Sequence, residues 1–128
     1  MLEERLQPTE RDAVSDFLRD RAAQAKRNPV PRLHEVLRWW QHTIEYLRNG
    51  YQFTEYDYVN DLDGRDLIDD ISALLGSDSR ALLEETIRPW DEEFRRLTIE
   101  TNELLHRGAT ATPRRWWWSR NPKEWPGR

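Results

Sequence analysis

Residues 31–50 read PRLHEVLRWWQHTIEYLRNG, and this stretch decides the fold. Its large apolar residues recur every three or four positions, which places them on one face of an α-helix. A proline suits the first turn of a helix, and an Asn-Gly pair terminates one. The residues on this apolar face are Leu33, Val36, Leu37, Trp40, Ile44 and Leu47. The pattern predicts an amphipathic helix whose apolar face has to be covered by other helices.

The segments at either end of the helical body carry similar spacing. Residues 9–28 are expected to form one helix that ends at an Asn-Pro pair. Residues 77–105 predict another, with apolar positions close to heptad spacing. Pro89 lies inside it, and proline lacks the amide hydrogen that a helix needs. We therefore expect either a kink or a new helix that begins near Pro89, with Gly108 ending the body.

The sequence marks the helix boundaries in the middle of the chain less clearly. Thr54 and Asp57 resemble a capping box, with Asp in place of the usual Glu, at the start of a short helix that reaches about Leu62. All five glycines fall between segments of apolar periodicity, so Gly64 is expected to separate this helix from the next one. The aromatic residues in 51–58 leave a short β-strand as an alternative.

Composition narrows the class of protein. The chain has 128 residues, no cysteine, 20 basic and 24 acidic residues. The lack of cysteine excludes disulfide scaffolds, thiolate zinc sites, iron–sulfur clusters and thiol nucleophiles. No stretch approaches the roughly 20 apolar residues of a membrane span, and the acidic N-terminus differs from a signal peptide, so a cytoplasmic location is expected. The prediction is an all-α single domain, a four-helix-like bundle.

The C-terminal residues have a different composition. Residues 1–108 form an acidic helical bundle of net charge −8, whereas residues 109–128 form an extended arm rich in Trp, Arg and Pro with net charge +4. Three consecutive tryptophans cannot share one face of a helix or a strand. The arm is expected to pack on its own bundle or on a partner subunit. Its predicted interaction residues are Arg114, Arg115, Trp116, Trp117, Trp118 and Trp125.

Residues 55–70 are dense in carboxylates and contain Arg65 as the single basic residue. A calcium-binding loop aligned on Gly64 would place Val59 at its first position, which needs an oxygen ligand, so this motif is excluded. The segment is expected to be a solvated acidic face or a contact for a basic partner, for which the arm is an internal candidate. The predicted interaction residues are Asp61, Asp63, Asp66, Asp69 and Asp70.

The helix at 31–50 has polar positions beside its apolar face. Trp39 lies about 100° around the helix from Trp40, so it either widens the buried face or lines a groove, and we include it among the interaction residues. His42 and Glu45 have the i, i+3 spacing of metal ligands in helical bundles. Such sites need further ligands from other helices, and we assign neither a metal nor a cofactor.

The function predicted from these features is a non-enzymatic interaction module that self-associates as a homo-oligomer or binds a protein partner through its aromatic arm and acidic face. The alternative is a small metal-dependent hydrolase-type bundle that uses His42, Glu45 and acidic residues of the middle helices. Dinucleotide, P-loop, zincin and nucleophile-elbow motifs are absent. An acidic body argues against nucleic-acid binding and against approach to anionic lipid.

Overall fold

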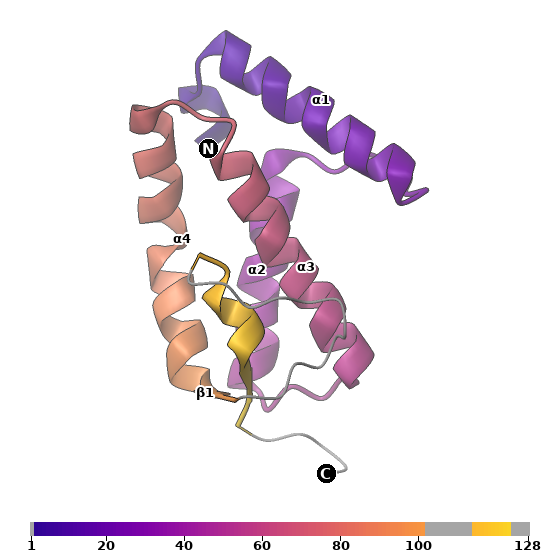
Figure 1. Cartoon of the computed structure of the whole chain (residues 1–128), viewed down its shortest axis with the longest axis vertical. Helices are drawn as coiled ribbons and strands as arrows, with labels where there is room; N and C mark the ends of the chain where they lie inside the picture. The colour runs from indigo at the N-terminus through magenta and orange to yellow at the C-terminus, as the bar shows by residue number, and fades with distance from the viewer. Residues whose placement is uncertain (1, 102–113, 124–128) are drawn as a thin grey trace.

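Four α-helices make up most of this computed structural model, which describes residues 2–101 and 114–123. The helices are α1 (Pro8–Gln24), α2 (Leu33–Arg48), α3 (Glu55–Ser72) and α4 (Ser77–Leu97). A short 3-10 helix, η1 (Leu2–Arg5), precedes them, and a second, η2 (Trp116–Ser119), lies in the C-terminal arm. The predicted all-α bundle with a C-terminal arm is confirmed (Figure 1). None of the described helices is long and apolar enough to cross a membrane.

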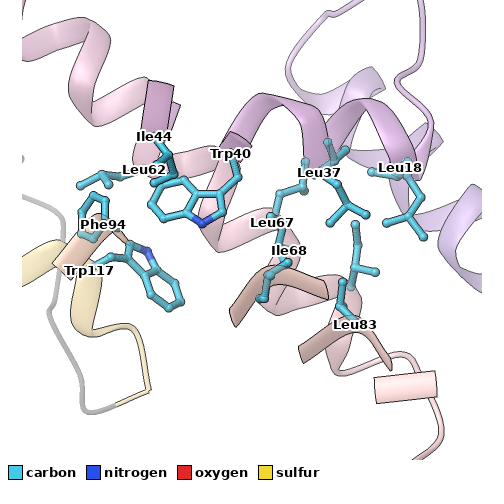
Figure 2. Packing of buried hydrophobic residues seen from close by; sticks show 14 of the residues in the cluster. Leu18, Leu37, Trp40, Ile44, Leu62, Leu67, Ile68, Leu83, Phe94 and Trp117 are labelled. Atoms are coloured by element: carbon cyan, nitrogen blue, oxygen red, sulfur yellow. The ribbon is translucent and has the colours of Figure 1, made fainter. Parts of the chain in front are cut away.

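The apolar face of α2 forms the centre of the core, as its spacing predicts. Every residue of that face is buried, and Trp40 is fully enclosed. Its ring centroid lies 5.0 Å from that of Phe94 on α4. Figure 2 shows Ile44, Leu62 and Trp117 gathered around these two rings. The arm therefore contributes a side chain to the same core as α2, α3 and α4.

The helix predicted over residues 77–105 is too long at its C-terminal end. It ends at Leu97, and Thr98–Glu100 form strand β1, which pairs antiparallel with strand β2 (Arg120–Pro122). The Thr98 hydroxyl also accepts a hydrogen bond from Nε of Arg120. Because the paired residues of the two strands are 20 to 24 positions apart in the chain, local spacing does not reveal this end.

Of the two alternatives predicted at Pro89, a kink or a new helix, the new helix is wrong, since α4 runs through the proline as one element. Buried residues of α4 lie on both sides of the proline, with Leu83 before it and Phe94 after it. Pro89 and Glu85, whose carbonyl loses its usual amide partner, both lie on the exposed side of the helix. Water can donate a hydrogen bond to that carbonyl, so the carbonyl is not left unsatisfied. Packing of the apolar face holds the helix together through the proline.

The predicted division of α3 at Gly64 is also wrong. The capping box is confirmed, because the Thr54 hydroxyl accepts a hydrogen bond from the Asp57 amide and the Asp57 carboxylate accepts one from the Thr54 amide, both at 3.1 Å. From there one helix continues to Ser72. A Cβ atom at Gly64 would lie 2.8 Å from the Trp39 ring. This glycine therefore permits close contact between α3 and α2 and does not end a helix.

Candidate functional site

The described part of the arm packs on its own bundle, over α3 and α4. Trp117 and Trp118 are 1% and 7% exposed and belong to the core. Trp116 is half-buried, with its ring centroid 5.8 Å from that of Phe94 and the Arg95 guanidinium 3.7 Å above it. The three consecutive indoles thus divide between the interior and its edge, as their spacing requires.

Asp66 on α3 receives both buried indole N–H groups of the arm. Its Oδ1 accepts hydrogen bonds from Nε1 of Trp117 at 2.7 Å and from Nε1 of Trp118 at 2.8 Å. Its Oδ2 lies 3.0 Å from Nη1 of Arg115. One carboxylate therefore satisfies donors from three side chains of the arm, those of Arg115, Trp117 and Trp118.

Two more carboxylates of α3 lie one turn further on and bind the arm's arginines. Nε of Arg115 lies 3.1 Å from Asp69, and its Nη2 lies 2.5 Å from Asp70. Arg114 lies 3.0 Å from Asp69. Burial by itself would lower the pKa of Arg115, but the three carboxylates outweigh it and raise that pKa. These contacts fix the orientation of the arm on α3.

Asp61, which the sequence placed in the same acidic face, lies instead in the interior. Its carboxylate accepts hydrogen bonds from Nε1 of Trp39 at 2.9 Å and from the Tyr51 hydroxyl at 2.6 Å. Burial raises the pKa of Asp61, and the two hydrogen bonds offset part of that rise. Burial and the bond to Asp61 raise the pKa of Tyr51 as well. Trp39 is half-buried, Asp63 is exposed, and Trp125 lies outside the described residues, as does the boundary at Gly108.

A buried ion pair between α3 and α4 is absent from the sequence-based predictions. Arg65 Nη2 lies 2.9 Å from Asp91, and the same carboxylate accepts a hydrogen bond from Nε1 of Trp40 at 3.0 Å. The guanidinium also lies 4.1 Å from the centroid of the Trp117 ring. A signal was present, because Arg65 shares a helical face with Leu62 and Ile68. Its acidic partner is on another helix and has no local signature.

His42 and Glu45 are exposed on α2. Among the residues that the structure describes, no three His, Asp or Glu side chains gather closely enough to hold a metal ion. The His42 ring has an aromatic neighbour, Tyr46, at 6.3 Å between ring centroids. Acidic residues of α3 were the candidates for further metal ligands beside His42 and Glu45. Those that are not exposed bind the arm or side chains of the interior instead.

The corner between α2 and α3 presents three exposed aromatic residues, which we call the aromatic surface: Tyr46, Phe53 and Tyr56. They are 38%, 45% and 82% exposed. Tyr46 and Phe53 pack edge to face with ring centroids 4.8 Å apart, and Phe53 also contacts the buried Tyr51 at 5.7 Å. The pair is therefore an ordered apolar feature in contact with water. The sequence marked Phe53 and Tyr56 only as part of a possible strand, and it placed Tyr46 in the helix over 31–50.

No protein-family model matches this sequence, and comparison with curated proteins and with solved structures gave no match. The function of this chain is therefore inferred from its own geometry. Two kinds of geometry are relevant to it. One is the internal contact of the arm with α3, and the other is the aromatic surface at the α2–α3 corner.

Proposed function

We propose that this protein is a non-enzymatic interaction module that binds a basic segment of a protein partner through its aromatic surface. The observation that carries the proposal is the exposed, edge-to-face pair of Tyr46 and Phe53, followed three residues later in the chain by the even more exposed Tyr56. Exposed apolar groups that cluster at one place are characteristic of interaction sites, and tyrosine is enriched among residues that dominate binding energy.

The charge of the surroundings supports a basic partner. Residues 49–64 contain no lysine or arginine and three exposed carboxylates, those of Glu55, Asp57 and Asp63. Exposed Glu45 and Asp57 lie next to Tyr46 and Tyr56 in the chain. Arg48, the nearest basic residue of α2, is held by Glu93 at 2.8 Å. Positive side chains of a partner would meet carboxylates around an aromatic centre, an arrangement that steers association and sets orientation.

The arm has a different part in this proposal from the one that its composition suggests. Its buried indoles and paired arginines use the carboxylates of Asp66, Asp69 and Asp70 within the chain. A partner would therefore meet the acidic positions nearer the start of α3. The arm serves to hold α3, and with it the aromatic surface, against α4.

Selection from a random peptide library tests the proposal. We expect the selected peptides to be enriched in lysine and arginine and to bind Phe53→Ser at least about tenfold more weakly than the unchanged protein, because the exposed ring supplies contact area. Ile99→Ser, which alters another half-exposed apolar residue on β1, is the matched control and should bind normally. Peptides without excess positive charge, or equal binding to both variants, would contradict the proposal.

Self-association is the competing use of the same surface. Light scattering behind a sizing column, on the full chain at several salt concentrations, is expected to give a monomer. A dimer that dissociates when Phe53 is changed to serine would mean that the occupant is a second copy of this chain. That result would overturn the basic-partner proposal.

A further inference from the structure

A cavity of about 420 Å³ opens between η1, α2 and α4. It is separate from the aromatic surface, and neither the described residues of the arm (114–123) nor the acidic segment of α3 lines it. Its size falls within the range of small-molecule sites, about 300–1,000 Å³. The side chains that matter for its chemistry are Leu2, Arg5, Leu37, Arg38, Leu82 and Trp90.

The cavity has a positive rim. Arg5 ends η1 and Arg38 lies on α2, and both are exposed. Neither arginine forms an ion pair or a side-chain hydrogen bond with any residue that the structure describes. The rest of the chain binds most of its arginines internally, as Arg48, Arg65 and Arg115 show. Two unused guanidinium groups at one opening can take a carboxylate.

The lining of this cavity differs from that of two other cavities in the chain. No carboxylate is among the described residues that line it, although the protein has 24 acidic residues. A second cavity, beside α1, includes Glu3 and Asp12, and a third, beside α3 and α4, includes Asp91 and Glu92. Carboxylates in those two would oppose an anionic ligand. The cavity at η1 is therefore the one whose charge suits an anion.

The two arginines are held in relation to each other by a contact between η1 and α2. The Glu3 carboxylate accepts a hydrogen bond from the His34 amide at 2.6 Å, and its Oε1 lies 3.0 Å from the His34 ring Nδ1. Glu3 is two residues before Arg5, and His34 is one turn before Arg38. This contact fixes η1 on α2 and so places both guanidinium groups at the same opening.

The remaining wall combines three polar residues, His34, Gln41 and Thr86, with four apolar ones. Leu37 is buried, and Leu2 and Trp90 are partly buried hydrophobic residues packed against the core. Leu82, Thr86 and Trp90 recur at every fourth position of α4, so they share one face over about 12 Å. The Thr86 hydroxyl donates to the Leu82 carbonyl at 2.8 Å and is satisfied within the helix. This face can take the apolar body of a ligand.

We infer that this cavity binds a small amphiphilic carboxylate, a molecule with one carboxylate group and an apolar body of medium length. Arg5 and Arg38 hold the carboxylate, and the face of α4 formed by Leu82 and Trp90 contacts the body. A guanidinium matches the planar geometry of a carboxylate with two parallel hydrogen bonds. The apolar contact adds affinity in proportion to the area removed from water.

Calorimetric titration with sodium octanoate tests both halves of the site. We expect saturable binding at millimolar concentration or below, and at least about tenfold weaker binding of octanol, which lacks the charge, and of acetate, which lacks the apolar body. Arg5→Gln and Arg38→Gln should each weaken octanoate binding about tenfold and leave octanol unchanged. Arg88→Gln removes an exposed arginine of α4 outside this cavity and is the control for general charge.

A second readout places the ligand. Trp90 carries the one indole among the described residues that line the cavity, so octanoate should shift its indole N–H signal in an NMR spectrum. The signal is assigned by its loss in Trp90→Phe. No saturable binding of octanoate, equal losses in Arg38→Gln and Arg88→Gln, or shifts confined to other indoles would each overturn the inference. Because Arg5 and Arg38 are exposed, circular dichroism should show unchanged folding in their variants.

Discussion

At the scale of single residues, the interior is shaped by polar side chains that each receive donors from aromatic residues. The Asp61 carboxylate accepts hydrogen bonds from Trp39 and Tyr51, and that of Asp66 accepts them from two indoles of the arm. The Asp91 carboxylate accepts hydrogen bonds from Trp40 and Arg65. An unsatisfied indole N–H in an apolar interior costs free energy, and a carboxylate is a strong acceptor for it. Each of these four indole N–H groups thus has an aspartate carboxylate as its acceptor.

The buried carboxylate of Asp61 predicts a distinct pH dependence of stability. Burial raises its pKa above the ordinary 3.8, so the folded state holds the proton more tightly than the unfolded state does. Its contribution to stability is complete below the ordinary pKa and is lost as pH rises through the raised, folded-state pKa. Urea unfolding should show that the protein's stability relative to Asp61→Asn falls as pH rises above about 4.

Glu10 provides a control of opposite sign. Hydrogen bonds from the Gln7 amide, the Gly76 amide and the Ser79 hydroxyl lower its pKa. Its contribution is present above the ordinary pKa and is lost as pH falls through the lowered one. Stability relative to Glu10→Gln should therefore rise with pH up to about 4.5 and stay level above it. Parallel curves for the two variants would contradict both assignments.

Gly64→Ala is a second test at this scale. Alanine favours a helix by about 1 kcal/mol over glycine, but its Cβ would lie 2.8 Å from the Trp39 ring. That ring is held by its bond to Asp61, so it cannot move without cost. We expect urea unfolding to show a net loss of about 1–2 kcal/mol. In a Trp39→Ala background the same change should be neutral or stabilising, and a stabilising effect in the unchanged protein would disprove the steric explanation.

At the scale of elements, α3 makes different contacts along its length. Its first half contributes to the aromatic surface and to the interior, and its second half binds the arm through Asp66, Asp69 and Asp70, which lie at i, i+3 and i+4. That spacing puts the three carboxylates on one face of the helix. Arg65, on a neighbouring face, connects α3 to α4. One side of α3 therefore carries charged residues, and another side carries apolar residues.

Asp66→Ala tests this division of α3. The substitution leaves two indole N–H groups without their acceptor, and the expected loss in the free energy of unfolding is about 2–4 kcal/mol. Asp20→Ala removes an exposed carboxylate of α1 and should change stability by no more than about 0.5 kcal/mol. Chemical denaturation of both variants provides the comparison. Equal losses would show that the indole contacts to Asp66 contribute nothing specific.

At the scale of the whole molecule, the described arm completes the core and the small sheet. Trp117 packs among residues of α2, α3 and α4, and β2 pairs with the strand that follows α4 (Figures 1 and 2). The Tyr58 hydroxyl adds a 2.6 Å hydrogen bond to the Arg120 carbonyl. The arm and the bundle are thus expected to unfold together.

Trp117→Ala tests this cooperative view. Removal of a fully buried tryptophan should lower the free energy of unfolding by about 3–5 kcal/mol and shift the whole melt, observed by far-ultraviolet circular dichroism. Ile99→Ala, at a half-exposed position of β1, is the control and should have a small effect. If Trp117→Ala changed only the association state and left the melt in place, the arm would be an assembly element as its composition alone suggests.

The sequence by itself determined the local features of this protein. The apolar spacing of α2, the capping box at Thr54 and the end of α2 before Gly50 depend on neighbours within one or two helical turns, so they can be predicted from the chain. The grouping of tryptophan and arginine in the arm, opposite an acidic segment, likewise identified the residues that meet at Asp66. For these features the determining physics is local periodicity and charge.

Only the tertiary structure decided the rest. The continuity of α3 through Gly64 depends on Trp39, the end of α4 depends on strand pairing with the arm, and the burial of Arg65 depends on Asp91. Each involves a partner distant in the sequence, and local propensity carries no information about such a partner. The burial of Trp117 and Trp118 and the exposure of Phe53 have the same cause, because aromatic side chains compete for the limited space of one core. Burial is a property of the assembled molecule, because the space that each side chain can occupy is set by all the others.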